Sequence, residues 1–284
     1  MAREIFSWID ANGVEHNLSG DDGIDVMIGP EGRFMPSFSF VEDKIPIQAG
    51  SRLRGINVEA REIDLPLEIT CTTQSELRNK IRNLLNWFNP LKGDGLLKCV
   101  AVDGTTRVLN CRYSGGLEIT ESGQTWQRMV LVLKAFDPYW YDSSTVVQTF
   151  TTGQPATFFP FFPLRLTSST VFADIAINNI GDVETNPEWI ITGPGDTIIL
   201  RNLTTGEIFN LNTSLGVGEI LIVNTKIGKK SVKKGDGKNL FGYQTDDSSL
   251  WALQQGQNSI RIEMSNATTD SSVQLTYTPR YWGA

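Results

Sequence analysis

Histidine is almost missing from this chain, which has a single one, His16, among 284 residues. Imidazole is the side chain that most often serves as general acid, general base or metal ligand near neutral pH. His16 stands between Glu15 and Asn17 in a polar stretch, where an exposed and inert side chain is expected. The scarcity of histidine favours a structural or binding protein over an enzyme, and no cofactor or metal site is predicted.

Cysteine is also rare, with three residues at Cys71, Cys99 and Cys111. Their spacing matches neither a CxxC pair nor a zinc ribbon, and an odd number leaves one thiol without a partner. Each lies in an apolar or strand-like stretch, so we expect small, buried, reduced side chains. Reduced thiols agree with synthesis in a cytoplasm.

Long apolar runs and the common catalytic motifs are absent as well. No stretch of about 18 apolar residues could span a membrane, and the first residues do not resemble a signal peptide. No GxSxG, SxxK, GxxxxGK[ST] or GxGxxG pattern occurs. Residues 21–25 lack the spaced ligands of a calcium-binding loop, so a turn is expected there. No catalytic residue is therefore predicted.

The chain carries 25 basic and 32 acidic residues, for a net charge of −7, which argues against nucleic-acid binding through the overall field. Positions 226–238 are the exception. This glycine-containing segment holds six lysines: Lys226, Lys229, Lys230, Lys233, Lys234 and Lys238. A solvated, lysine-rich hairpin is the favoured interpretation, and contact with an acidic partner is the alternative.

The first half combines strands with one helix. Positions 63–69 alternate apolar and polar residues, and Pro66, which has no N–H group, predicts an edge strand or a bulge. Thr73 and Glu76 form a capping-box pattern, and a single apolar stripe follows to Phe88. The sequence therefore predicts an amphipathic helix over residues 74–88 that covers one face of a sheet.

The run around Met129 and Leu131 is apolar on both faces, as is typical of a central strand. One face would lie under the helix and the other against a second sheet or another subunit. Met129, Leu131 and Pro66 are therefore candidate interface residues.

Residues 143–163 have the composition of a linker between a first domain, 1–142, and a second, 164–284. The linker ends in four phenylalanines interleaved with prolines, a pattern that excludes a helix. These aromatic side chains would form an adhesive patch in water, so we expect them between domains or subunits. They are Phe158, Phe159, Phe161 and Phe162.

From position 164 onward, at least seven short apolar or alternating runs are separated by turn-forming residues. This pattern predicts an all-β sandwich. The complete chain is therefore expected to be mainly β, with an α+β first domain and a β-sandwich second domain. Trp189, Tyr243 and Trp251 lie in the second domain as possible sugar- or partner-contacting aromatics, although core positions are the favoured interpretation.

Several segments together resemble the distal tail protein family of long-tailed, non-contractile bacteriophages. In the first half they are 56–70 (with REIDLPL at 61–67), 89–96 (NPLKGDGL), 107–116 and 135–140 (AFDPYW). In the second half they are 178–182 (NNIGD), 192–195 (TGPG), 202–206 (NLTTG) and 249–251 (SLW). The resemblance covers nearly the whole chain, and it depends on the order and spacing of motifs that are individually weak.

This resemblance implies a structural virion protein of the tail tip. The first domain would form a ring, generally a hexamer, that joins the major tail tube protein to the tail-associated hub or lysin. The second would be a galectin-like sandwich that supports a receptor-binding protein or touches a cell-wall glycan. DNA would be only passing cargo in an acidic channel, to which it should not adhere.

Physical features agree with a ring, because closed rings need heterologous contacts between subunits. The Met129 run, the strand with Pro66 and the turn-rich segment 43–55 are candidates for such contacts. The alternatives are a monomeric carbohydrate-binding module that recognises the bacterial surface and, less favoured, a wall-degrading glycosidase.

Overall fold

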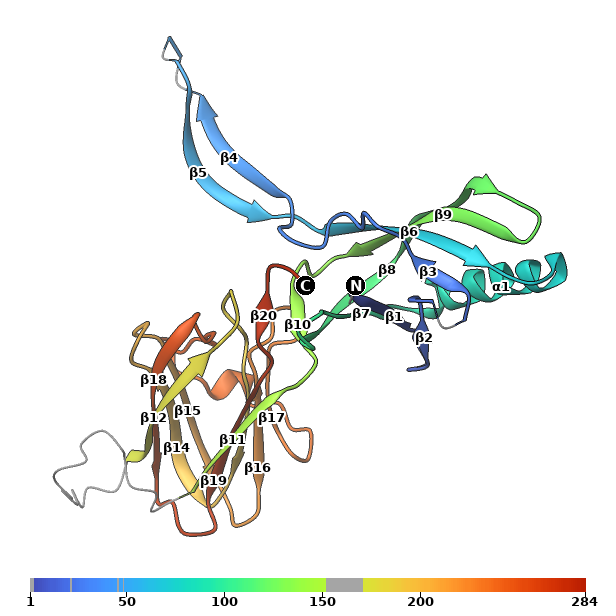
Figure 1. The fold of residues 1–284 in the computed structure, drawn as a ribbon. Coiled ribbons are helices and arrows are strands. Elements are labelled where there is room, and N and C mark those ends of the chain that lie inside the picture. The colour runs from blue at the N-terminus through green and yellow to red at the C-terminus, as the bar shows by residue number, and fades with distance from the viewer. Residues whose placement is uncertain (1–2, 21, 45, 48, 152–170) are drawn as a thin grey trace. The chain divides into compact units, whose positions relative to one another are not determined.

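Buried and exposed side chains alternate along the strands of both halves, as the period-two patterns predict. The computed structural model describes all residues except 1–2, 21, 45, 48 and 152–170 (Figure 1). It divides into a first unit, Met1–Ser143 with Tyr281–Ala284, and a second unit, Ser144–Arg280. The predicted mainly β fold class is confirmed.

The first unit begins with β1 (Ile5–Ile9), β2 (Glu15–Asn17), β3 (Ile24–Val26), β4 (Phe38–Lys44), β5 (Ser51–Val58), β6 (Arg61–Thr70) and α1 (Gln74–Trp87). It continues with η1 (Pro90–Lys92), β7 (Gly95–Val100), β8 (Thr106–Ser122), β9 (Trp126–Ala135) and β10 (Trp140–Asp142). Seven strands form one sheet in the order β2-β1-β7-β8-β9-β6-β3. β10 joins it beside β8 and also pairs with the terminal strand β20 (Arg280–Tyr281). β4 and β5 form a separate two-stranded sheet.

The long strand β8 links the two halves of the main sheet. Its residues up to Cys111 pair with β7, and those from Arg112 onward pair with β9. One cluster of buried side chains draws on both halves, with Trp8 from β1, Leu97 from β7 and Leu65 from β6. The core of the first unit therefore lies where the sheet and α1 meet.

Helix α1 begins as its capping residues predict. Thr73 Oγ1 accepts a hydrogen bond from Glu76 N (3.2 Å), whereas the Glu76 carboxylate accepts from Thr72 N (3.0 Å), one residue earlier than the capping-box pattern implies. Leu77 and Leu84 are buried against the sheet, but Leu85 is exposed, although the apolar stripe included it. A helix can bury only one stripe, and Leu85 lies next to Leu84 in sequence and therefore about 100° around the axis.

β6 is not the edge strand that Pro66 predicted. It pairs with β9 on one side and with the short strand β3 on the other. The Pro66 carbonyl accepts from Met27 N (2.8 Å), so the nitrogen of Pro66 faces the side where β3 has just ended. The missing N–H is tolerated because the paired strand on that side is only three residues long.

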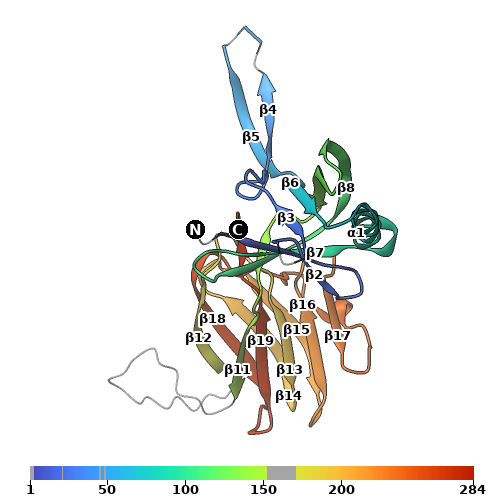
Figure 2. The ribbon, with the colours of Figure 1, turned by 45° about the vertical axis from the view of Figure 1, so that its right-hand side comes forward.

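The second unit contains β11 (Val146–Thr151), β12 (Val171–Asn179), β13 (Glu188–Thr192), β14 (Gly195–Asn202), β15 (Ile208–Leu215), β16 (Ile220–Asn224), β17 (Ser231–Lys234), η2 (Phe241–Tyr243), β18 (Gly256–Ser265) and β19 (Ser272–Tyr277). One sheet has the order β11-β19-β13-β16-β17 and the other β12-β18-β14-β15 (Figure 2). Their inward side chains share one apolar cluster, as in a β sandwich.

The segment 143–163, expected to be a linker, begins with a strand. β11 pairs with β19 over six residues, from Val146 opposite Tyr277 to Thr151 opposite Ser272. The Ser, Thr and Gln content that suggested a linker is also compatible with an exposed edge strand, whose outward side chains face water. The four phenylalanines at 158–162 lie outside the described residues.

The three cysteines lie in the first unit, and two of them are fully buried. Cys99 and Cys111 belong to its core, whereas Cys71 is half-buried. Burial raises the pKa of the Cys99 thiol, and it raises the pKa of Cys111 to about 12. Burial also raises the pKa of Cys71, although Cys71 retains some exposure.

These thiols should therefore differ in reactivity, because the thiolate is the attacking species. With Ellman's reagent at pH 8, we expect about one thiol per chain to react in the folded protein and all three in guanidinium chloride. The Cys71→Ser variant should then give almost no reaction while folded. Rapid reaction of all three thiols without denaturant would contradict the burial of Cys99 and Cys111.

Candidate functional site

In the part of the chain that the model describes, no three His, Cys, Asp or Glu side chains gather so as to hold a metal ion. His16 is not the exposed residue that its polar neighbours suggested. Its ring stacks on Trp87 (centroids 4.1 Å apart), and Nε2 lies 3.3 Å from Asp10 Oδ2. No helix among the described residues is long and apolar enough to cross a membrane.

Two of the three aromatic residues proposed for sugar or partner contact are core residues. Trp189 and Trp251 are 1% and 3% exposed and meet edge to face, with centroids 5.5 Å apart. Trp251 Nε1 also donates to the Leu200 carbonyl (3.1 Å). Neither ring can present a face to a sugar, because the sandwich core covers both. Of the three, only Tyr243 in η2 is exposed, at 51%.

Tyr243 therefore offers a clean test of sugar binding. Removal of a half-exposed ring should change the free energy of unfolding of the Tyr243→Ala variant by less than about 0.5 kcal/mol. We expect a glycan array to give no ligand for the parent chain or the variant. A glycan that binds the parent and is lost in Tyr243→Ala would restore the carbohydrate-binding alternative.

The candidate interface residues also differ in burial. Met129 and Leu131 are buried in the first unit's own core and so cannot contact another subunit. The opposite face of β9 carries Val130 and Val132, which are only partly buried. Pro66 is likewise half-buried on β6. The period of two in a strand explains this result, since a doubly apolar strand buries one set of residues and leaves the alternate set nearer the surface.

The segment between β3 and β6 exposes several large apolar side chains. β4 and β5 form a two-stranded hairpin, which we call the β4–β5 arm (residues 38–58), and Figure 1 shows it leading away from the other strands. Its base is held by Glu59 N donating to the Ser37 carbonyl (2.9 Å) and by the Phe38 ring near Trp282. Five large apolar side chains on the arm are exposed: Phe40, Val41, Ile47, Leu53 and Ile56.

Four of these side chains lie on β4 and β5, which pair with no further strand among the described residues, and Ile47 lies in the turn between them. Phe40 and Ile56 are directly opposite each other across the hairpin, so their side chains share a face. An isolated two-stranded hairpin is marginally stable in water, and apolar residues concentrated on it indicate a surface for another protein. Part of this segment, 43–55, was predicted to contact another subunit, whereas Phe40 and Ile56 were not among the predicted interface residues.

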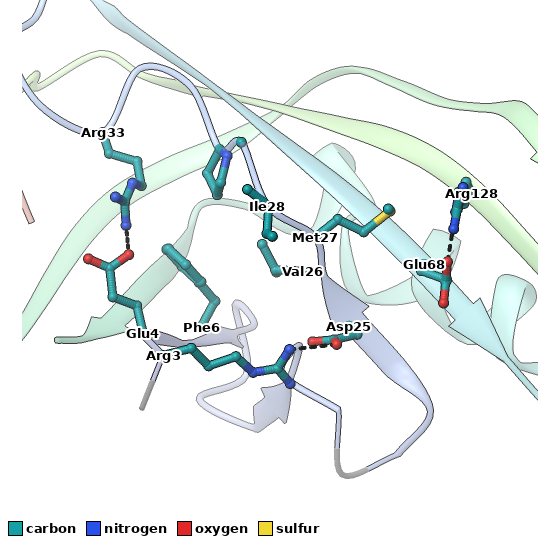
Figure 3. Close-up of a pocket in the computed structure, with 12 residues that line it drawn as sticks. Arg3, Glu4, Phe6, Asp25, Val26, Met27, Ile28, Arg33, Glu68 and Arg128 are labelled. Atoms are coloured by element: carbon teal, nitrogen blue, oxygen red, sulfur yellow. Dashed lines mark hydrogen bonds and ion pairs between the residues drawn. The ribbon is translucent and has the colours of Figure 1, made fainter. Parts of the chain in front are cut away.

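A groove of about 620 Å³ lies in the same unit, beside β3 (Figure 3). It is lined by Arg3, Glu4, Phe6, Asp25, Val26, Met27, Ile28, Gly29, Pro30, Arg33, Glu68 and Arg128. Three ion pairs border it: Arg3–Asp25 (2.7 Å), Arg128–Glu68 (2.7 Å) and Arg33–Glu4. Figure 3 shows the apolar side chains of Val26, Met27 and Ile28 among these pairs. An apolar floor with a neutralised, charged rim has the composition of a protein-docking surface.

The base of the arm is organised by Arg61, which the sequence analysis did not single out. Its side chain is buried, at 1% exposure, and donates only to backbone carbonyls. The acceptors are Pro138 O (2.7 Å), Gly32 O (2.8 Å), Phe34 O (2.6 Å) and Trp282 O. Burial lowers the pKa of Arg61 to about 10, so the guanidinium stays charged at neutral pH.

Arg61 therefore connects three distant segments of the first unit. Gly32 and Phe34 precede the arm, Pro138 lies between β9 and β10, and Trp282 is near the end of the chain. Gly32 has φ of 75°, and a Cβ there would lie 1.9 Å from the Glu62 carbonyl oxygen, so only glycine fits. The alternation that buries Ile63 also directs Arg61 inward, and this signal could have identified it.

Two family models match the chain. The model described as phage tail protein RIFT-related domain matches residues 12–109, and the model described as siphovirus-type tail component, C-terminal domain, matches residues 180–281. No curated protein sequence matches.

Among solved structures, the chain is similar to the crystal structure of SPP1 Dit, described as a hub adsorption apparatus protein of phages that infect Gram-positive bacteria. The TM-score is 0.71 at 16% identity, over 97% of this chain and 98% of that one. Two structures of the phage P2 baseplate in its activated conformation are also similar. The one with calcium gives a TM-score of 0.54 at 12% identity over 98% of each chain. The one with strontium gives 0.52 at 10% identity, over 96% of this chain and 97% of that one.

Proposed function

Because this chain belongs to the distal tail protein family of long-tailed, non-contractile phages, we propose that it is the subunit of a closed ring in the phage tail tip. The ring is a homo-oligomer, most simply a hexamer, and its subunits are structural rather than catalytic. The protein is a virion component made in the host bacterial cytoplasm. The similarity of fold to a hub adsorption protein and to baseplate components supports this role.

One observation carries the ring proposal: the exposed apolar side chains of the β4–β5 arm. Full burial of one phenylalanine or isoleucine side chain contributes about 1.5–3 kcal/mol. Burial of Phe40 and Ile56 alone would therefore contribute several kcal/mol to an interface between copies. The arm has no partner sheet within the described part of its own unit, so a neighbouring molecule is the natural partner.

The groove beside β3 is the surface we propose for that contact on the next copy. Its floor is apolar and its charged side chains are already paired with each other. An apolar arm can therefore bind there without leaving a buried charge unpaired. Arm and groove are different surfaces of one subunit, and the contact between copies is therefore heterologous. Heterologous contacts generate closed rings when the rotation between subunits closes.

Such a ring would join the major tail tube protein on one side to the tail-associated hub or lysin on the other. The second unit would support a receptor-binding component. The net charge of −7 suits a conduit in which DNA is only passing cargo, because like charges keep the DNA from adhering.

The mass in solution tests this proposal. Light scattering on the purified protein, together with negative-stain images, should give a multiple of the 31.5 kDa chain mass and annular particles. Because some rings close only during assembly, the measurement should be repeated with the tail tube protein present. Monomers alone under both conditions would contradict the ring.

A carbohydrate-binding module is the alternative function. It is not the function we propose, because Trp189 and Trp251 are core residues and Tyr243 alone does not form an aromatic platform. A wall-degrading glycosidase would need a pair of positioned carboxylates. We expect no turnover of purified cell wall.

A further inference from the structure

A strongly basic surface runs along one edge of the second unit. Its lysines lie on the turn between β16 and β17, on β17 itself and on the turn that follows. We call it the lysine surface, and it comprises Lys226, Lys229, Lys230, Lys233, Lys234 and Lys238. Gly228 and Gly237, both at positive φ, form the two turns, and no atom lies within 4 Å of the position where a Cβ would be.

Two arginines elsewhere in this unit are paired with carboxylates. Arg201 pairs with Glu263 (2.9 Å) and Arg261 with Asp174 (2.7 Å). On the lysine surface, Lys234 pairs with Glu219 (2.7 Å). Lys229, Lys230 and Lys233 are exposed or partly exposed and have no carboxylate within 4.0 Å among the described residues. Unpaired positive charge is therefore concentrated here, in a protein whose net charge is negative.

The shape of this surface is linear. β17 has four residues and is about 13 Å long, so the lysines at its two ends and on the strand spread along a line. The edge of β17 is already closed, because Leu240 N donates to Val232 O (2.8 Å) and Lys234 N to Lys238 O (2.9 Å). A peptide therefore cannot add beside β17 as a further strand.

The composition of the surface argues against a partner that binds through apolar anchors. Ile227 is the one large apolar side chain exposed between positions 226 and 238, so the aromatic and apolar anchors that dominate protein interfaces are missing from this segment. Lysine ammonium groups act as point charges that suit phosphate oxygens without a fixed bidentate geometry. We propose that the lysine surface binds a linear phosphodiester polymer along β17. This chemistry is shared by nucleic acids and by the polyol-phosphate chains of bacterial walls.

Fluorescence anisotropy with two labelled probes tests the proposal: a single-stranded oligothymidylate and a poly(glycerol phosphate) chain of similar length. If about four lysines contact phosphates, affinity should fall about 50-fold between 50 and 200 mM salt. The triple variant Lys229→Glu, Lys230→Glu, Lys233→Glu should bind at least about 100-fold more weakly at 50 mM salt. A matched control, Arg78→Glu, Arg82→Glu, Lys92→Glu, makes the same charge change in the first unit and should bind like the parent.

Binding of either probe that follows these expectations supports the proposal, and preference for one probe identifies the source of the polymer. Three results would overturn it: no binding of either probe at 50 mM salt, equal losses in both triple variants, or equally tight binding of polyglutamate. The last result would assign the surface to an acidic protein. Affinity is expressed per chain, so this outcome does not depend on whether the ring forms. Circular dichroism of both variants checks that they are folded.

Discussion

The Arg61→Met variant is expected to lose about 3–5 kcal/mol of the free energy of unfolding of the first unit, because each buried carbonyl left without a donor costs about 1–3 kcal/mol. Methionine keeps much of the side-chain volume but removes every donor. Carbonyl oxygens of Gly32, Phe34, Pro138 and Trp282 would then be left without the guanidinium in a buried site. Since domains are stable by only about 5–15 kcal/mol, this loss is a large part of the total.

Urea unfolding followed by hydrogen exchange measures this effect separately in each unit. Peptides from β6 should lose protection in Arg61→Met, whereas peptides from β18 should not. Arg54→Met is the matched control in the same unit, because Arg54 is half-exposed and pairs with Asp43 at the surface. That change should cost no more than about 1 kcal/mol. Equal unfolding midpoints for the two variants would show that Arg61 does not hold these segments together.

Polar substitution on the arm is expected to abolish ring formation. In the Phe40→Ser, Ile56→Ser variant, two exposed, directly opposed apolar side chains are removed from the β4–β5 arm. The lost burial corresponds to about 3–6 kcal/mol per subunit contact, or at least a hundredfold in its association constant. Light scattering should then give the monomer mass at concentrations where the parent forms rings.

The variant should remain folded, because neither residue belongs to the core of the first unit. Its thermal unfolding should match that of the parent chain measured as a monomer. Val217→Ser, Leu203→Ser is the control, since it removes two exposed apolar residues from the second unit. Rings of unchanged mass in the arm variant would show that the contact between subunits lies on another surface.

Local patterns explain which parts of the fold were predictable. The α1 helix follows from a cap and an apolar stripe, both of which lie between Thr73 and Phe88. The strands follow from alternation, which is also local, and so does the sandwich of the second unit. The same patterns could not reveal that β11 pairs with β19, because the partners are more than a hundred positions apart in the sequence.

The candidate site was less predictable, for a related reason. Aromatic residues have the same identity in a core and on a binding surface, and burial alone separates Trp189 and Trp251 from Tyr243. Met129 and Leu131 were candidates for a subunit contact because their strand is apolar on both faces, but their own face is covered by the first unit's core. Phe40 and Ile56 became candidates only once their strands were seen to pair with each other alone.

The sequence by itself determined the fold class, the helix, the lack of familiar catalytic motifs and the resemblance to a phage tail family, because these depend on residue order and short-range periodicity. Tertiary structure alone decided that Arg61 joins three segments, that His16 is stacked on Trp87 and that the arm has no partner sheet among the described residues. The physical reason is that burial and hydrogen bonding are properties of residues brought together from distant positions. The scarcity of histidine can be read from the composition alone, whereas the exposed surfaces that suggest assembly exist only in the folded chain.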